Sequence, residues 1–129
     1  MEPGLEGVVE ETVTEAMTAR ALGSGDVPAL GTPAVLALVE AAACRALEGA
    51  LGEEETSVGT RIELSHDAPT PVGTPVTATA RLVEVDGRTL TFEVRLSDPG
   101  GDVATGRHVR AVVRRERFLE RLGKGQAAG

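Results

Sequence analysis

One carboxylate in this sequence stands in unusually apolar surroundings. Glu40 is the only charged residue in the twelve-residue stretch Pro33–Cys44, which is otherwise dominated by Ala, Leu and Val. Burying an unpaired carboxylate is costly unless its pKa rises enough to keep it neutral. A carboxylate in such a place can act as a general base or a nucleophile. We therefore interpret Glu40 as a catalytic candidate; the alternative is a structural residue that reaches solvent or pairs with an arginine such as Arg45.

Two further side chains could take part in hydrolytic chemistry. Thr32 precedes Pro33 and is expected to cap a helix, where its hydroxyl would also lie close to a developing oxyanion. Eight positions separate Thr32 from Glu40, about 12 Å along an ideal helix. That is too far for both to reach one carbon unless intervening atoms or a second protomer bridge the gap. His66 lies where a predicted strand ends in a proline-bounded loop. It is either an ordinary solvent-facing residue or an acid–base group that acts near neutral pH.

Four other residues have a less distinctive setting. Gly59 interrupts a predicted strand, which indicates a β-bulge or a close approach of another group to the backbone. His108 and Arg110 are two positions apart on a predicted strand and so share a face, where we expect ordinary cross-strand partners of acidic residues. Cys44 follows Glu40 by four positions on an apolar helix, and we expect a packed core thiol.

The elements that must position these residues follow from hydrophobic periodicity and from turn residues. The clearest is a helix over Pro33–Leu51, with Thr32 as its N-cap and proline at its first position. Residues 22–31 are rich in glycine and predict a loop. Asp86-Gly87 predicts a type I′ hairpin. The segments with strand-like patterns are 6–14, 56–65, 75–85, 89–97 and 103–115.

This order of elements predicts an α+β domain of two layers, with one long helix lying on one face of a five-stranded antiparallel sheet. Residues 1–122 are expected to form this single domain, ending in a short helix over 114–122, with 123–129 as a flexible tail. The helix is apolar on nearly every side, so one sheet cannot cover it completely. We therefore expect a dimer, in which a second copy covers the remainder.

Composition excludes several functional classes. The chain has 129 residues, a net charge of −7, and no Trp or Tyr and only two Phe. It therefore lacks both the basic surface and the stacking platform of a nucleic-acid-binding protein. No apolar run approaches the roughly 18 residues of a membrane helix. One cysteine and two histidines show no metal-ligand spacing, so no metal or cofactor is expected. An acidic N-terminal segment, unlike a secretory signal, favours a cytoplasmic location.

Several short motifs occur in a fixed order along the chain. They are Gly31-Thr32, Glu40 followed by Ala-Ala-Ala-Cys-Arg, Ser57-Val58-Gly59-Thr60, His66 with Thr70-Pro71, Val85-Asp86-Gly87-Arg88, and Gly106-x-His108-x-Arg110-Ala-Val. With this set the chain resembles the hot-dog-fold thioesterases, and in particular fluoroacetyl-CoA thioesterase-like proteins, over about Gly25 to Arg117. The resemblance implies a hot-dog fold, in which the five-stranded antiparallel sheet is wrapped around one long central helix. In that family two protomers pair their sheets, and acyl-CoA threads between them.

The resemblance also implies a reaction and the residues that perform it. The expected activity is hydrolysis of a small to medium acyl-CoA thioester by a homodimer or a higher oligomer. Thr32, Glu40 and His66 would form the catalytic set at the dimer interface, the Gly59 N–H would contact the thioester carbonyl, and Arg110 would bind or orient a polar part of the substrate. Whether Thr32 or Glu40 is the nucleophile or activates water stays open.

One difference from the fluoroacetyl-specific relatives concerns substrate choice. Those enzymes carry an aromatic lid, whereas Leu22–Ala43 contains no aromatic residue. We therefore expect room for a longer or branched acyl group. Two other functions remain as alternatives: a non-catalytic acyl-CoA-binding hot-dog dimer, which would bind thioesters without turnover, and a hydratase or dehydratase. The latter usually carries an Asp-x4-His pair, which this chain lacks.

Overall fold

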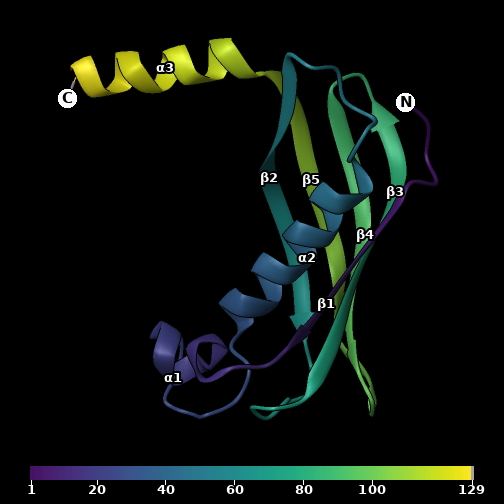
Figure 1. Ribbon diagram of the computed structural model, residues 1–129, viewed down its shortest axis with the longest axis vertical. Helices are drawn as coiled ribbons and strands as arrows, with labels where there is room; N and C mark the ends of the chain where they lie inside the picture. The colour runs from purple at the N-terminus through teal and green to yellow at the C-terminus, as the bar shows by residue number, and fades with distance from the viewer. Residues whose placement is uncertain (129) are drawn as a thin grey trace.

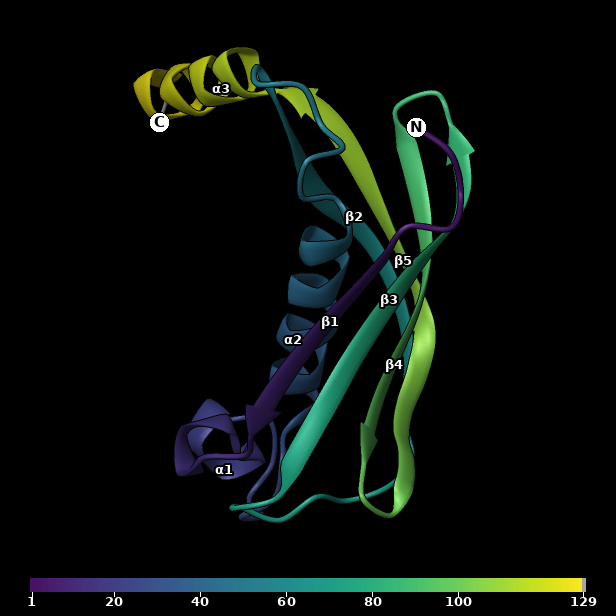
Figure 2. The ribbon, with the colours of Figure 1, turned by 45° about the vertical axis from the view of Figure 1, so that its right-hand side comes forward.

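A curved antiparallel sheet forms one layer of the structure, and a single long helix forms the other (Figure 1). The computed structural model describes the backbone of residues 1–128 and the side chains of residues 1–123. The strands are β1 Glu6–Thr12, β2 Glu55–His66, β3 Pro75–Asp86, β4 Thr89–Asp98 and β5 Gly101–Arg114, in the spatial order β1-β3-β4-β5-β2. The sheet curves around α2 (Figure 2), which confirms the predicted hot-dog architecture.

The central helix, α2 Thr32–Ala46, is covered by the sheet on one side only. It packs against β1, β3 and β4 through the buried residues Val35, Val39, Ala42, Ala43 and Ala46. The opposite side exposes Ala37, Ala41 and Cys44. The prediction that Cys44 is packed in the core is therefore wrong for the single chain, because its side of the helix faces away from the sheet. The helix also ends earlier than the predicted Leu51, in a series of turns.

The sheet alternates between a face that packs on α2 and a face that points outward. The buried hydrophobic side chains of β3 and β4 fall at every second position, as a half-buried sheet requires. They are Val76, Ala78, Ala80, Leu82, Leu90, Phe92, Val94 and Leu96. On β5 the same alternation buries Ala104, His108, Arg110 and Val112. Two polar residues thus lie on the core face of this strand.

The strand ends agree with the sequence prediction to within two residues, but one turn differs. Asp86 pairs with Thr89, so Gly87 and Arg88 are the central residues of the hairpin. A type I′ turn needs positive φ at both central positions. Only Gly87 has it, with φ 59°, and no non-glycine residue in the described part of the chain does. The hairpin is confirmed, whereas its turn follows the type II′ pattern, in which glycine comes first.

The C-terminal helix extends away from the rest of the molecule. In Figures 1 and 2, α3 leaves the end of β5 and projects beyond the sheet. It spans Arg115–Ala128, six residues further than the predicted short helix over 114–122. Of the tail predicted for 123–129, only Gly129 lies outside the described residues. None of the helices in the described part of the chain is long and apolar enough to cross a membrane.

Candidate active site

The hydroxyl of Thr32 and the imidazole of His66 lie in direct contact. Thr32 Oγ1 is 2.8 Å from His66 Nδ1, although the residues are 34 positions apart. The N-cap of α2 is Gly31, with extended backbone and no side-chain capping bond, and Thr32 is the first helical residue. The predicted capping role of Thr32 is therefore wrong. Its hydroxyl is free of the helix backbone and bonds to the imidazole instead.

Backbone contacts between two loops hold this pair together. The segment before α2 is tied to the loop after β2, because the Leu30 N–H donates to the Thr70 carbonyl at 2.9 Å and Ala29 bridges Pro71. The Gly31 N–H donates to the carbonyl of Met17, at the end of the short helix η1 Glu15–Met17, also at 2.9 Å. The start of α2 and the end of β2 are thereby fixed side by side.

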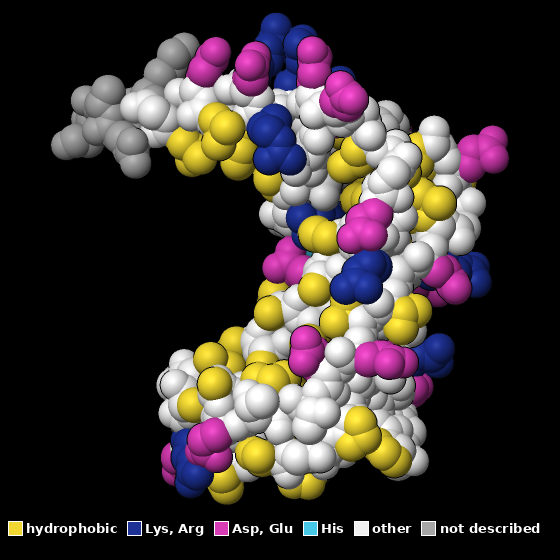
Figure 3. Space-filling model, viewed as in Figure 1, with side chains coloured by type: hydrophobic (Ala, Val, Ile, Leu, Met, Phe, Trp, Pro, Cys, Tyr) yellow, Lys and Arg dark blue, Asp and Glu magenta, His cyan; other side chains and the backbone are white. Residues whose placement is uncertain are grey.

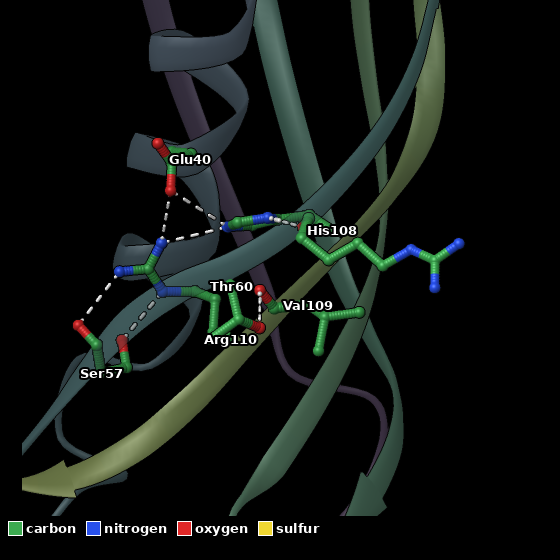
Figure 4. Close-up of polar contacts among 7 residues, drawn as sticks. Glu40, Ser57, Thr60, His108, Val109 and Arg110 are labelled. Atoms are coloured by element: carbon green, nitrogen blue, oxygen red, sulfur yellow. Dashed lines mark hydrogen bonds and ion pairs between the residues drawn. The ribbon is translucent and has the colours of Figure 1, made fainter.

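A second polar group surrounds Glu40 in the middle of α2 (Figure 4). Arg110 Nη1 on β5 donates to Glu40 Oε2 at 2.9 Å and to His108 Nε2 at 3.0 Å. The Arg110 side chain is 7% exposed and that of Glu40 is 35% exposed. Glu40 is therefore a paired carboxylate at the edge of the core. It pairs with Arg110 rather than Arg45, which forms a surface ion pair with Glu48.

Glu40 makes all of its described polar contacts through one oxygen. Both Arg110 and His108 approach Oε2, the latter at 3.4 Å. Among the residues whose side chains are described, no hydrogen bond reaches Oε1, which points away from the arginine in Figure 4. The arrangement leaves one carboxylate oxygen able to accept a proton from another molecule while the other stays fixed.

Gly59 lies directly beneath the carboxylate. A Cβ added there would overlap Glu40 Oε2 and would lie 3.1 Å from His108 Cε1. The register of β2 against β5 also shifts between Gly59 and Arg61. Both interpretations of Gly59 are thus confirmed, since a register shift follows it and the Glu40 side chain approaches its backbone.

Ser57 on the edge strand β2 holds the Arg110 guanidinium through two hydrogen bonds. The Arg110 Nε donates to Ser57 Oγ at 2.9 Å, and its Nη2 donates to the Ser57 carbonyl at 3.1 Å. The cross-strand neighbours of Arg110 are Gly59 and Leu90, and those of His108 are Ile62 and Phe92. The shared face of His108 and Arg110 is confirmed, but the predicted acidic cross-strand partners are wrong. Their acidic neighbour is Glu40, whose side chain reaches them from α2.

The five site residues predicted from sequence thus form two groups within one chain. Thr32 and His66 form one; Glu40, Gly59 and Arg110 form the other. Eight positions of α2, about 12 Å of helix rise, separate Thr32 from Glu40. His66 Nε2 is buried and has no hydrogen-bond partner among the described residues. In the same part of the chain, no group of three or more His, Cys, Asp or Glu side chains is placed to hold a metal ion.

Sequence and structure comparisons point to one family of proteins. Residues 13–116 match the profile of fluoroacetyl-CoA-specific thioesterases. The fluoroacetyl-CoA thioesterase of Streptantibioticus cattleyicolor is 38% identical over 95 residues, or 74% of this chain and 68% of that protein. The crystal structure of a phenylalanine-to-alanine variant of a fluoroacetyl-CoA-specific thioesterase is 31% identical, with a TM-score of 0.89 over 97% of both chains. A hypothetical thioesterase-superfamily protein from Thermus thermophilus is 26% identical, with a TM-score of 0.88 over 99% of this chain and 97% of its own.

Proposed function

The chain belongs to the fluoroacetyl-CoA-specific thioesterase family and is an acyl-CoA thioesterase of the hot-dog fold; on this premise we propose that Thr32, Glu40 and His66 are its catalytic residues. The observation that carries the proposal is the 2.8 Å contact between Thr32 Oγ1 and His66 Nδ1. A hydroxyl in contact with an imidazole is the arrangement by which a weak oxygen nucleophile is activated.

The first half of the reaction uses this pair. His66 Nδ1 accepts the Thr32 proton while Oγ1 attacks the thioester carbonyl carbon, and the C–S bond then breaks. The proton held by His66 passes to the departing sulfur, which leaves as the CoA thiol, and the acyl group remains as an ester on Thr32. The backbone N–H of Gly59 contacts the thioester carbonyl, and Arg110 binds or orients a polar part of the substrate.

The second half uses Glu40. Its Oε1, to which no described residue forms a hydrogen bond, takes a proton from water as the water oxygen attacks the ester carbonyl. The C–O bond to Thr32 breaks, the proton held by Glu40 passes to Thr32 Oγ1, and a carboxylic acid is released. The Arg110 contact to Oε2 keeps the carboxylate in place during this step.

These roles require that the two groups of residues meet, and a homodimer provides the means. In a dimer, Thr32 and His66 of one protomer face Glu40 of its partner. The small side chains Ala37, Ala41 and Cys44 leave an apolar stripe of α2 uncovered, and β2 is an edge strand beside it. Figure 3 shows the molecule hollowed between α3 and the α1 segment (Ala19–Leu22), with hydrophobic side chains along the hollow. The buried, unpartnered His66 Nε2 also favours a site completed by a second chain.

Substitution of Glu40 tests the proposal. Glu40→Gln keeps the volume and an amide oxygen for Arg110 but removes the base, so we expect kcat to fall by about 10² or more. The weakened hydrogen bond to a charged arginine should cost about 1 to 3 kcal/mol of unfolding free energy. Steady-state hydrolysis of acetyl-, butyryl- and an aryl-acyl-CoA, with calorimetric binding of CoA as the folding control, gives the answer. Near-full kcat in Glu40→Gln would contradict the assigned chemistry.

A further inference from the structure

A buried imidazole that the proposed reaction does not use stands behind the Glu40–Arg110 pair. The His108 side chain is 2% exposed, and its ring lies 6.4 Å from that of Phe92, between centroids. Figure 4 shows it on the core face of β5, level with the Arg110 guanidinium and below the Glu40 carboxylate. The large majority of buried polar groups in proteins are hydrogen-bonded. The partners of both ring nitrogens therefore indicate what this residue does.

The hydrogen-bond partners determine the protonation state of His108. Nδ1 is 2.9 Å from the Arg61 carbonyl oxygen, which can only accept, so Nδ1 carries a hydrogen. Nε2 is 3.0 Å from Arg110 Nη1, which can only donate, so Nε2 presents its lone pair. The neutral tautomer with hydrogen on Nδ1 satisfies both contacts at once.

The guanidinium is held in one orientation by this imidazole. Arg110 Nη1 has two hydrogens, and they meet Glu40 Oε2 and His108 Nε2. Its other nitrogens bond to Ser57. Without the acceptor on His108, one N–H of a 7% exposed arginine would be left without a partner. A rotation of the guanidinium toward Glu40 would satisfy this N–H by bonding both carboxylate oxygens, as in a bidentate pair.

We propose that His108 is a positioning residue for hydrolysis: as a neutral acceptor it restricts Arg110 to a single hydrogen bond with Glu40 Oε2 and so keeps Glu40 Oε1 free to take the proton of water. The inference rests on the role proposed for Glu40. It adds to the site a residue that acts through Arg110 and Glu40 and does not contact the substrate itself.

Protonation of His108 reverses this arrangement. A hydrogen on Nε2 would point at the donor Arg110 Nη1, and the remaining acceptor nearby is Glu40 Oε2 at 3.4 Å. The charged groups that face the ring are Glu40 from α2 and Arg110 from β5; β2 contributes the Arg61 carbonyl and β4 the Phe92 ring. Burial lowers the pKa of His108 below 6.5, and the Arg110 charge adds to this, against the Arg61 hydrogen bond and the Glu40 charge. The neutral form is thus favoured at pH 7.

Two substitutions separate the acceptor from the imidazole. His108→Leu keeps a similar volume without an acceptor, and we expect kcat to fall about 10- to 100-fold, as for other losses of catalytic geometry. His108→Gln offers an amide oxygen to Arg110 but does not titrate. It should recover most of kcat and keep a larger fraction of its pH 7 activity at pH 5.5 than the wild-type enzyme does.

The kcat–pH profiles of both variants and of Glu40→Gln, measured on the full chain with thermal unfolding as the folding control, test the inference. A wild-type kcat–pH profile in His108→Leu, or equal losses of kcat in the Leu and Gln variants, would overturn the role of His108. If Glu40→Gln is inactive in the same experiment, the proposed function still holds. An active Glu40→Gln would overturn the proposed function and this inference with it. If His108→Leu does not fold, the comparison of His108→Gln with wild type at low pH decides.

Discussion

Thr32 Oγ1 lies 2.8 Å from His66 Nδ1, and the hydroxyl makes this bond because Gly31, not Thr32, caps α2. A Thr32 substitution therefore removes the hydroxyl without removing a helix cap, so its effect on kcat can be read apart from an effect on helix stability. The contact joins the first turn of the helix to the last residue of β2, so it depends on the whole path of the chain between them.

Thr32→Ala should lower kcat by about 10² or more, because it removes the hydroxyl that His66 activates. The unfolding free energy should change by about 1 kcal/mol, the value of one partly exposed hydrogen bond. Thr32→Ser keeps the hydroxyl and should retain most of the activity. Steady-state kinetics with urea unfolding of both variants checks this. An alanine variant that is fully active would remove Thr32 from the mechanism.

Gly59→Ala should displace the Glu40 carboxylate and lower kcat. The added Cβ would overlap Glu40 Oε2, which can shift because it is the end of a flexible side chain, so the cost is that of its weakened bond to Arg110, about 1 to 3 kcal/mol. Relief requires the carboxylate to move away from Arg110, so we expect a large loss of kcat as well. Gly123→Ala is the matched control, since a Cβ there meets nothing within 4 Å. Equal activities of the two variants would show that the approach of Glu40 to Gly59 has no role.

The buried His108 should make stability depend on pH in a definite direction. Its folded-state pKa lies below the unfolded value of 6.5, so between the two the unfolded chain binds more protons. The free energy of unfolding therefore falls as pH drops below about 6.5 and this contribution is fully lost below the folded-state pKa; above 6.5 the residue adds no pH dependence. His108→Gln lacks this loss. Urea unfolding from pH 7.5 to 5 should show the wild type losing stability relative to the variant, and a constant difference would contradict the buried, neutral assignment.

Substrate choice is expected to differ from that of the fluoroacetyl-specific relatives. The segment Leu22–Ala43 has no aromatic side chain, and Ala41, next to Glu40, is exposed in the single chain. A hydrophobic pocket resolves even one methylene by only about 1 to 3 kcal/mol. We expect butyryl- or branched acyl-CoA to be accepted and fluoroacetyl-CoA to be favoured over acetyl-CoA by less than about 100-fold in kcat/KM, or about 2.7 kcal/mol. A larger preference would show that small side chains suffice for this discrimination.

Much of the fold could be predicted because local patterns determine it. Pro33 and the Ala- and Leu-rich run indicate the helix, and alternation along residues 75–97 indicates a hairpin of half-buried strands. The end of α2 and the turn at Gly87 were less predictable, since they depend on the chain's path after each element.

The candidate site was predictable only in part. The isolation of Glu40 on an apolar helix singled it out, but its pairing with Arg110, 70 positions away, depends on which face of β5 meets α2. The same uncertainty concealed His108. A signal was present, because Ala104 and Val112 share its parity on the strand and are apolar, which places His108 on the core face. The prediction for Cys44 failed for a different reason. A small apolar residue on a helix indicates burial, but the sequence does not show whether its own chain or a partner chain covers it.

The activity of mixed dimers measures whether two protomers share one active site. Thr32→Ala and Glu40→Gln chains carrying different affinity tags are co-expressed, and the doubly tagged dimer is isolated. With Thr32 and His66 facing the partner's carboxylate, one of its two sites combines an intact Thr32 with an intact Glu40. A shared site should give the mixed dimer about half of the wild-type kcat per dimer, with each homodimer inactive. A mixed dimer as inactive as its parents would contradict the shared site.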